Sequence, residues 1–216
     1  MKKWITAFAV VIFTMIMMPN IAKADYYSEQ KTLYFGMQSY EVQNLQKDLQ
    51  YLGYFTQANT TTYFGGITKN AVMAFQYNNG LSVDGIVGPQ TARMIKAKKV
   101  VKSAKSYTGV PYVWGGSSPK GFDCSGFTSY IMSENGITIP RVSANQYYFG
   151  KWVNKDQLQP GDLVFFTTYK PGPSHVGIYL GNNQFVHASS GAGKITISLM
   201  DNPYYSQRYL GARRVI

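Results

Sequence analysis

Only one cysteine, Cys124, occurs in the 216 residues, and this limits how the chain can be stabilised. No intramolecular disulfide is possible, so the fold must be held by packing. A lone thiol is most often a small buried hydrophobe, and its surroundings decide whether it has a chemical role. In an exported chain, a leftover thiol invites a chemical explanation.

Residues 1–24 have the layout of a secretory signal peptide. Lysines at positions 2 and 3 precede an uncharged, mostly apolar run over 4–18, and a small-x-small site follows at 22–24. The apolar run is shorter than the roughly 20 residues that a membrane span needs. We therefore expect cleavage after Ala24, secretion, and no membrane contact afterwards.

The mature chain would still be basic. Without the lysines of the leader, the formal net charge of +11 falls to +8. A secreted basic protein meets anionic polymers, and cell-wall polymers are the expected partners rather than nucleic acid. The alternative is that the basic charge only keeps the protein soluble and binds no polymer.

Residues 33–96 are predicted to form a small all-α domain of three helices. The first helix is expected over 40–52 with Ser39 as its N-cap, the second from about 68 to 80, and the third from Pro89.

A short sequence pattern is repeated at the starts of the second and third helices. Phe64-Gly65-x-x-Thr68 is matched by Val87-Gly88-x-x-Thr91. With the apolar spacing of its helices, this segment resembles the peptidoglycan-binding three-helix module found beside many wall hydrolases. It departs from that pattern at 61–63, where Thr-Thr-Tyr replaces the usual Asp-Gly pair, so the first turn is expected to differ. A spacer without a ligand is the alternative.

Residues 97–216 are predicted to form a second domain of the α+β class. A basic connector over 96–102 leads into a helix that ends near Tyr107, and the cysteine helix follows a glycine-rich aromatic loop. The strands come later in one run, which favours an antiparallel sheet. They are expected over residues 163–166, 174–180, 184–189, 194–199 and 209–215.

Cys124 is expected in the first turn of its helix, because Asp123 is a good N-cap. Free backbone N–H groups and the helix dipole favour an anion there and would lower the pKa of the thiol. Asp123 opposes this effect if its carboxylate lies near the sulfur.

The two histidines, His175 and His187, lie on strands of one predicted hairpin. If the loop is the three residues 181–183, Leu180 pairs with Gln184 and both histidines point to the same face. A two-residue Asn-Asn turn would place them on opposite faces. We expect the first register.

These residues suit thiol hydrolysis. Cys124 can act as nucleophile, His175 as the base that takes its proton, and His187 as the group that orients the base. The alternatives are hydrogen-bonded core histidines or a zinc half-site, but no further ligands cluster at metal spacing. No cofactor or metal is expected.

Six sequence blocks carry a second resemblance, to the NlpC/P60 family of cell-wall cysteine peptidases. They are Tyr112-x-Trp114-Gly115-Gly116, Phe122-Asp123-Cys124-Ser125-Gly126-Phe127, Pro140-Arg141, Gly161-Asp162-Leu163-Val164-Phe165-Phe166, His175-Val176-Gly177-Ile178-Tyr179 and Phe185-Val186-His187-Ala188. The resemblance implies a papain-like fold and cleavage of peptidoglycan stem peptides, commonly between γ-D-glutamate and the following diamino acid.

The resemblance also implies site residues. Cys124, His175 and His187 correspond to the nucleophile, the base and the orienting residue. Substrate-binding positions correspond to Tyr112, Asp123, Ser125 and Arg141, whereas Trp114 is expected to pack beneath the cleft.

The leading hypothesis is a monomeric, secreted, wall-associated endopeptidase whose small domain holds it on peptidoglycan. A non-catalytic wall-binding relic of the enzyme fold is one alternative, and an N-acetylmuramoyl-L-alanine amidase on the same scaffold is another.

Overall fold

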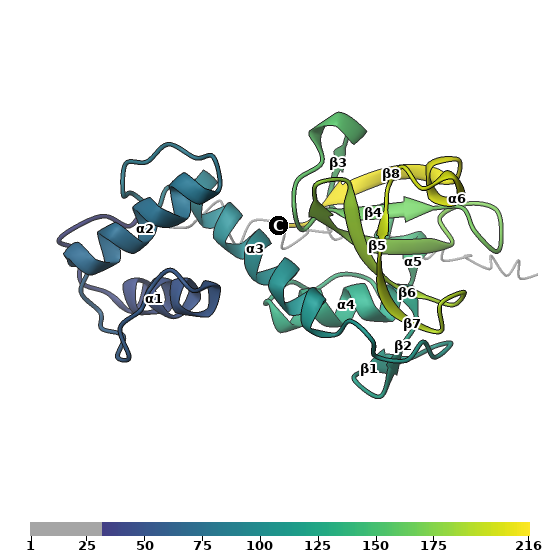
Figure 1. Cartoon of the computed structure of the whole chain (residues 1–216), viewed down its shortest axis with the longest axis horizontal. Helices are drawn as coiled ribbons and strands as arrows, with labels where there is room; N and C mark the ends of the chain where they lie inside the picture. Colours follow the sequence, from purple (N-terminus) through teal and green to yellow (C-terminus); the bar gives the residue numbers. More distant parts are fainter. Residues whose placement is uncertain (1–31) are drawn as a thin grey trace, which may run out of the picture.

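The computed structural model describes residues 32–216 as two lobes joined by one helix (Figure 1). The expected signal peptide at 1–24 lies outside the described residues. Within residues 32–216, no helix is long and apolar enough to cross a membrane.

Helices dominate the first lobe, and a sheet with short helices forms the second. The helices are α1 Tyr40–Leu52, α2 Gly66–Asn78, α3 Pro89–Ser106, α4 Cys124–Glu134, α5 Ser143–Gln146 and α6 Pro203–Ser206, with a 3₁₀ turn at Lys155–Gln157. The strands are β1 Ser117–Ser118, β2 Gly121–Phe122, β3 Lys151–Val153, β4 Leu163–Phe166, β5 His175–Gly181, β6 Gln184–Ser189, β7 Lys194–Leu199 and β8 Tyr209–Arg214. The α+β expectation is confirmed.

In the helical lobe, α1 begins and ends as its sequence predicts. The Ser39 side chain accepts a hydrogen bond from the Val42 N–H at 3.4 Å, and Gly53 ends the helix in the left-handed region at φ 89°. α2 starts at Gly66, two residues earlier than expected.

Two buried glutamines explain the sequence pattern repeated at the starts of α2 and α3. Gln46 Nε2 donates to Thr68 Oγ1 at 2.9 Å, while its Oε1 accepts from the Thr61 N–H at 2.6 Å. Gln76 does the same one repeat later, with Thr91 Oγ1 at 3.2 Å and the Gly85 N–H at 2.9 Å. Each glutamine therefore ties the loop after its helix to the start of the next helix, and the Thr-Thr-Tyr departure keeps this clamp.

The structure corrects one expectation, because α3 is a single helix rather than a third helix, a connector and a fourth. Ile95 belongs to the core of the first lobe, whereas Val100 and Ala104 belong to that of the second. Lys99 pairs with Asp48 of α1 at 2.5 Å. The domain boundary predicted near residue 97 thus falls inside one continuous helix.

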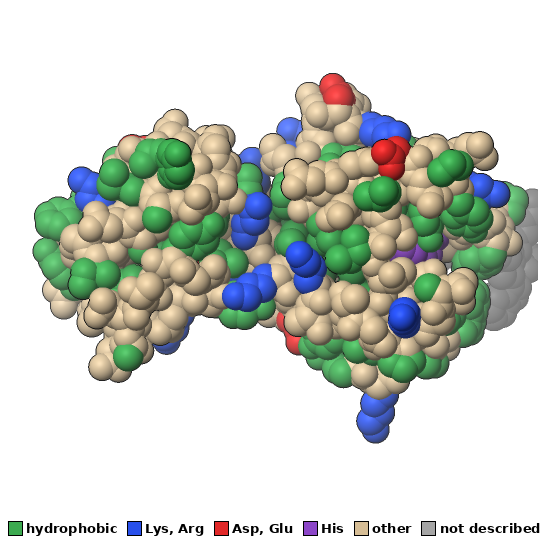
Figure 2. Space-filling model, in the orientation of Figure 1, with side chains coloured by type: hydrophobic (Ala, Val, Ile, Leu, Met, Phe, Trp, Pro, Cys, Tyr) green, Lys and Arg blue, Asp and Glu red, His purple; other side chains and the backbone are tan. Residues whose placement is uncertain are grey.

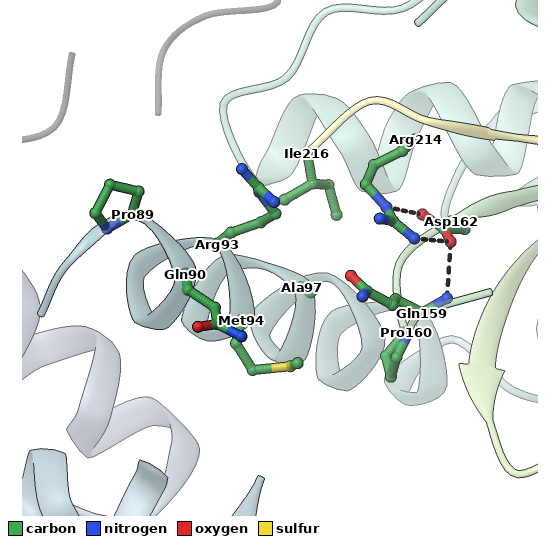
Figure 3. A pocket seen from close by; sticks show the side chains of 10 residues that line it. All are labelled: Pro89, Gln90, Arg93, Met94, Ala97, Gln159, Pro160, Asp162, Arg214 and Ile216. Carbon is green, nitrogen blue, oxygen red and sulfur yellow. Dashed lines mark hydrogen bonds and ion pairs between the residues drawn. The ribbon is translucent and has the colours of Figure 1, made fainter. Parts of the chain in front are cut away.

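A cavity of about 350 Å³ lies where α3 meets the second lobe. Figure 3 shows Arg93 and Met94 on the helix, with the Arg93 side chain extending toward Ile216, and Asp162 bonded to Arg214 and to the Gln159 N–H. Both lobes line this cavity, but neither Cys124 nor a histidine does. It is therefore separate from the candidate active site.

The second lobe is built on a six-stranded antiparallel sheet in the order β3-β8-β4-β5-β6-β7. All four residues of β4 are buried, as expected for a central strand. α4 packs against β5 and β6, so the helix that begins at Cys124 lies beside the histidine hairpin.

Candidate active site

Helix α4 presents Cys124 at its N-terminus. The Asp123 carboxylate accepts a hydrogen bond from the Gly126 N–H at 2.6 Å and caps the helix, as its sequence predicts. Gly126 allows close contact with the preceding loop, because a Cβ there would lie 2.0 Å from the Gly116 carbonyl oxygen. The Cys124 thiol is buried, and its Sγ lies 3.9 Å from the carbonyl oxygen of Ser174, the residue before His175.

The hairpin brings both histidines to one face by a route that differs from the expected one. Asn182 and Asn183 form a two-residue turn with φ of 49° and 63°, rather than a three-residue loop. A register shift between Tyr179 and Gly181 leaves Leu180 without a paired residue. The expected pairing of Leu180 with Gln184 is wrong, because Gln184 pairs with Gly181. The extra residue restores the expected alignment farther from the turn, where Ile178 pairs with Val186, and so keeps both histidines on one face.

The two imidazoles form a chain that leads away from the cavity. His175 Nε2 lies 2.8 Å from His187 Nδ1, and His187 Nε2 lies 3.0 Å from Ser198 Oγ. His175 Nδ1 is the ring nitrogen outside this bond, and His175 lines the same cavity as Cys124. If Nδ1 accepts a proton from the thiol, then Nε2 of His175 donates to His187, whose own Nε2–H donates to Ser198. One consistent set of tautomers therefore leaves Nδ1 of His175 able to accept a proton.

Aromatic rings hold the second imidazole in place. His187 is 0% exposed, stacks on Phe185 at 4.7 Å between ring centroids, and meets the edge of Tyr205 at 5.3 Å. The nitrogens of the two histidines point at each other, which suits a shared proton rather than one metal ion.

Burial keeps the Cys124 thiol and the two imidazoles uncharged at rest. It lowers the pKa of His175 to about 4, and it lowers the pKa of His187 well below its usual value, with the neighbouring His175 as a second cause. Burial and then the Asp123 carboxylate raise the pKa of the Cys124 thiol. The expected lowering by the helix N-terminus is therefore outweighed, and the resting pair is a thiol beside a neutral imidazole.

Cys124 and His175 line one open cavity of about 480 Å³. In Figure 2, histidine side-chain atoms reach the surface in a recess of the sheet lobe. The predicted substrate-binding residues line the same cavity, namely Tyr112, Asp123, Ser125 and Arg141. His187 does not line it and contacts it through His175.

Arg141 fastens the glycine-rich loop to the cysteine helix. Its guanidinium donates to both carboxylate oxygens of Asp123 at 2.9 and 2.7 Å, and to Ser125 Oγ at 3.0 Å. It also donates to the carbonyls of Gly115 and Gly116. Its charge is thus matched within the protein, and it shapes the wall beside Cys124.

The structure corrects the expected position of Trp114 and adds site residues that the sequence did not indicate. Trp114 does not pack beneath the cleft but lines it, 71% exposed, with its ring 5.4 Å from that of Tyr169. Lys170, beside Tyr169, lines the cavity as well. Ser198 was also missed, although the alternation along 194–199 places it on the strand face opposite Ile195 and Ile197.

Comparison with protein families gives two matches along the chain. Residues 109–214 match the NlpC/P60 family, and residues 38–95 match a peptidoglycan-binding domain family. The two segments correspond to the sheet lobe and the helical lobe.

Individual relatives match the sheet lobe. "Probable peptidoglycan endopeptidase LytE" of Bacillus subtilis (strain 168) is 46% identical over 122 residues, covering 56% of this chain and 35% of LytE. "Gamma-D-glutamyl-L-lysine dipeptidyl-peptidase" of Bacillus cereus is 40% identical over 122 residues, covering 56% of this chain and 37% of that protein. The chain thus spans little more than a third of these two relatives.

A solved structure matches over nearly its whole length. The P60 domain of antigen MAP1204 from M. avium subspecies paratuberculosis is 37% identical, with a TM-score of 0.51. The match covers 58% of this chain and 98% of that domain.

Proposed function

Because this chain belongs to the NlpC/P60 family, we propose that it is a cysteine endopeptidase that hydrolyses peptidoglycan stem peptides. The bond proposed for cleavage joins γ-D-glutamate to the diamino acid that follows it. One observation carries the proposal: Cys124 and His175 line the same cavity, and His175 is oriented from behind by a 2.8 Å bond to His187. The names of the relatives support a wall peptide as the substrate.

The proposed reaction follows from the neutral resting pair. His175 Nδ1 takes the proton of the Cys124 thiol as the sulfur attacks the scissile carbonyl carbon. The imidazolium then gives that proton to the leaving amine, and a thioester remains on the sulfur. His175 next deprotonates a water that attacks the thioester, which releases the acid and restores the thiol.

Backbone N–H groups can stabilise the intermediate. The N–H groups of Cys124 and Ser125 lie near the sulfur at the start of α4, where hydrogen bonds from them favour its thiolate form. The same donors suit the oxyanion that forms when the carbonyl is attacked.

We assign substrate contacts to Tyr112, Asp123, Ser125 and Arg141. The Asp123 carboxylate, which Arg141 holds in the cleft wall, would accept a hydrogen bond from the free amine of an L-alanine residue, and Tyr112 lies on the same cavity. Arg141 already binds Asp123 and Ser125, so its proposed part is to hold these groups at fixed positions.

The helical lobe is proposed to hold the enzyme on the wall. A groove of about 400 Å³ lies between the loop after α1 and the start of α2. Phe55, Tyr63 and Ile67 give it apolar walls, while Gln57 and Asn59 add amides. This mixture suits sugar rings that carry acetamido groups. Tethering through such a groove would raise the local concentration of substrate.

The proposed setting is outside the cell, on the wall. It rests on the signal-like leader and on the basic charge, which would also favour anionic wall polymers. Figure 2 shows Lys and Arg side chains gathered on this face where the two lobes meet. The protein is proposed to act as a monomer without a cofactor.

Mass spectrometry of fragments released from defined muropeptides tests the function, with the Cys124→Ala variant beside the wild type. Fragments ending at D-glutamate, absent with the variant, are expected. Release of whole stem peptides would instead identify an amidase. Tight wall binding without any release would identify a non-catalytic relic.

A further inference from the structure

The charges that line the catalytic cavity are unevenly matched. Asp123 and Arg141 pair with each other at 2.7 Å. Lys170 lines the same cavity and makes no ion pair with any residue in the described range 32–216. The cavity wall therefore carries an ammonium group whose charge is free to meet a ligand.

Lys170 lies on a loop whose base is anchored near the catalytic base. The loop joins β4 to β5, and His175 is the first residue after it. Thr167 Oγ1 donates to the Gly172 carbonyl at 3.0 Å, and the Thr168 N–H donates to Ser174 Oγ at 2.8 Å. The base of the loop is thus held in the frame that positions His175.

The tip of the loop contacts the glycine-rich loop at the cavity. Tyr169 is 59% exposed, lines the cavity, and its ring meets that of Trp114, another lining residue, edge to face at 5.4 Å. The Lys170 ammonium lies 5.6 Å from the centre of the Tyr169 ring. Burial, with Cys124 as the next cause, raises the pKa of the Tyr169 phenol. Tyr169, Lys170 and Cys124 line the same cavity.

We propose that Lys170 binds a carboxylate of the stem peptide and makes the enzyme prefer stems that carry more carboxylates near the scissile bond. This inference rests on the proposed function and names the substrate form that the site selects. Two carboxylates could supply the charge: the α-carboxylate of D-glutamate and the additional carboxylate of diaminopimelate. A stem with L-lysine keeps the side-chain ammonium group of diaminopimelate but lacks its additional carboxylate, so it offers Lys170 one anionic group fewer.

The size of the effect follows from exposure. An ammonium group at a wet rim interacts weakly with a carboxylate, so loss of the matched pair should reduce kcat/KM about fivefold rather than abolish turnover. The preference should shrink at high salt, because the Debye length falls from about 10 Å at 0.1 M to about 3 Å at 1 M.

Four soluble stems separate the two carboxylates. They combine D-glutamate or D-isoglutamine with diaminopimelate or L-lysine, and kcat/KM is measured for each with the wild type, Lys170→Met and Lys170→Glu. The wild type should favour the stem with the matched carboxylate about fivefold, Lys170→Met should remove the preference, and Lys170→Glu should reverse it. Lys120→Met, which removes an exposed lysine outside the cavity, should behave as the wild type.

The proposal would be overturned if the ratios of kcat/KM among the four stems were the same in the wild type, Lys170→Met and Lys170→Glu. Binding of the same stems to Cys124→Ala, measured by calorimetry, separates this failure from failure of the proposed function. If no stem is hydrolysed, the endopeptidase assignment is wrong, and the affinities of Cys124→Ala with and without Lys170→Met still decide whether Lys170 recognises a carboxylate.

Discussion

His175 Nε2 and His187 Nδ1 lie 2.8 Å apart, and the second ring is completely buried between Phe185 and Tyr205. The imidazole of His175 therefore cannot turn without breaking this bond. Its orientation and its tautomer depend on a residue that does not line the cavity.

Replacing His187 should reduce turnover by misplacing His175. His187→Ala is expected to lower kcat by about 100-fold, because the base loses the acceptor that fixes its tautomer. His187→Asn, whose side-chain oxygen can accept near the position of Nδ1, should retain more activity. Steady-state kinetics on a soluble stem would measure both, with circular dichroism to verify folding. Equal losses in the two variants would contradict an orienting role.

Asp123→Asn should make the thiol more acidic. The Asp123 carboxylate raises the pKa of Cys124, so removing its negative charge stabilises the thiolate, while asparagine still caps the helix. The rate of iodoacetamide alkylation against pH should shift to lower pH. Asp156→Asn, on the 3₁₀ turn, is the matched control and should leave the profile unchanged. An unshifted profile in Asp123→Asn would show that the carboxylate does not act on the sulfur.

The sheet lobe should lose stability as the pH falls from about 6.5 to about 4. Burial lowers the pKa of His175 from 6.5 to about 4, so over that window the unfolded chain binds more protons than the folded one. At about 1.36 kcal/mol per pH unit, His175 alone accounts for about 3 kcal/mol.

Urea unfolding followed by tryptophan fluorescence measures this loss. Trp114 and Trp152 both lie in the sheet lobe and report on it. The double variant His175→Gln, His187→Gln should show a flatter dependence over the same window. A wild-type slope as flat as that of the double variant would contradict the assigned burial effect.

Tyr63→Ala should weaken wall binding without changing the chemistry. Tyr63 is 48% exposed on the groove of the helical lobe, so its loss should lower the retention of protein on purified wall sacculi about tenfold. The kcat/KM for a soluble stem should stay the same. Tyr77→Ala, which removes an exposed tyrosine outside that groove, is the control. Equal retention of both variants would place the wall contact elsewhere.

Patterns local in the chain predicted most of the fold. Ser39 and Asp123 as caps, the apolar run of β4 and the alternation of β7 each depend on neighbours within a few residues. These signals predicted the starts of α1, α3 and α4, the strands β4 to β8 and the antiparallel class, but not β1, β2, β3, α5 or α6. They also predicted that Cys124 begins a helix and that the histidines share a face.

Other features depend on contacts between distant segments. The continuity of α3 was missed because its basic stretch resembles a linker, yet Lys99 pairs with Asp48 of α1 and Val100 joins the core of the other lobe. Trp114 and Tyr169 are 55 positions apart in the numbering, so no local pattern indicates that their rings meet at the cavity.

The sequence by itself determined which chemical groups the protein carries and the elements on which they lie, because caps, periodicity and turn residues act over short ranges. Only the tertiary structure decided how those groups behave. Burial raises the pKa of Cys124 more than the helix N-terminus lowers it, and burial lowers the pKa of His175, so both groups are uncharged. Desolvation of this kind depends on everything packed around a group. Strand pairing in the folded sheet likewise decides that Leu180 stays unpaired, and this keeps both histidines on one face.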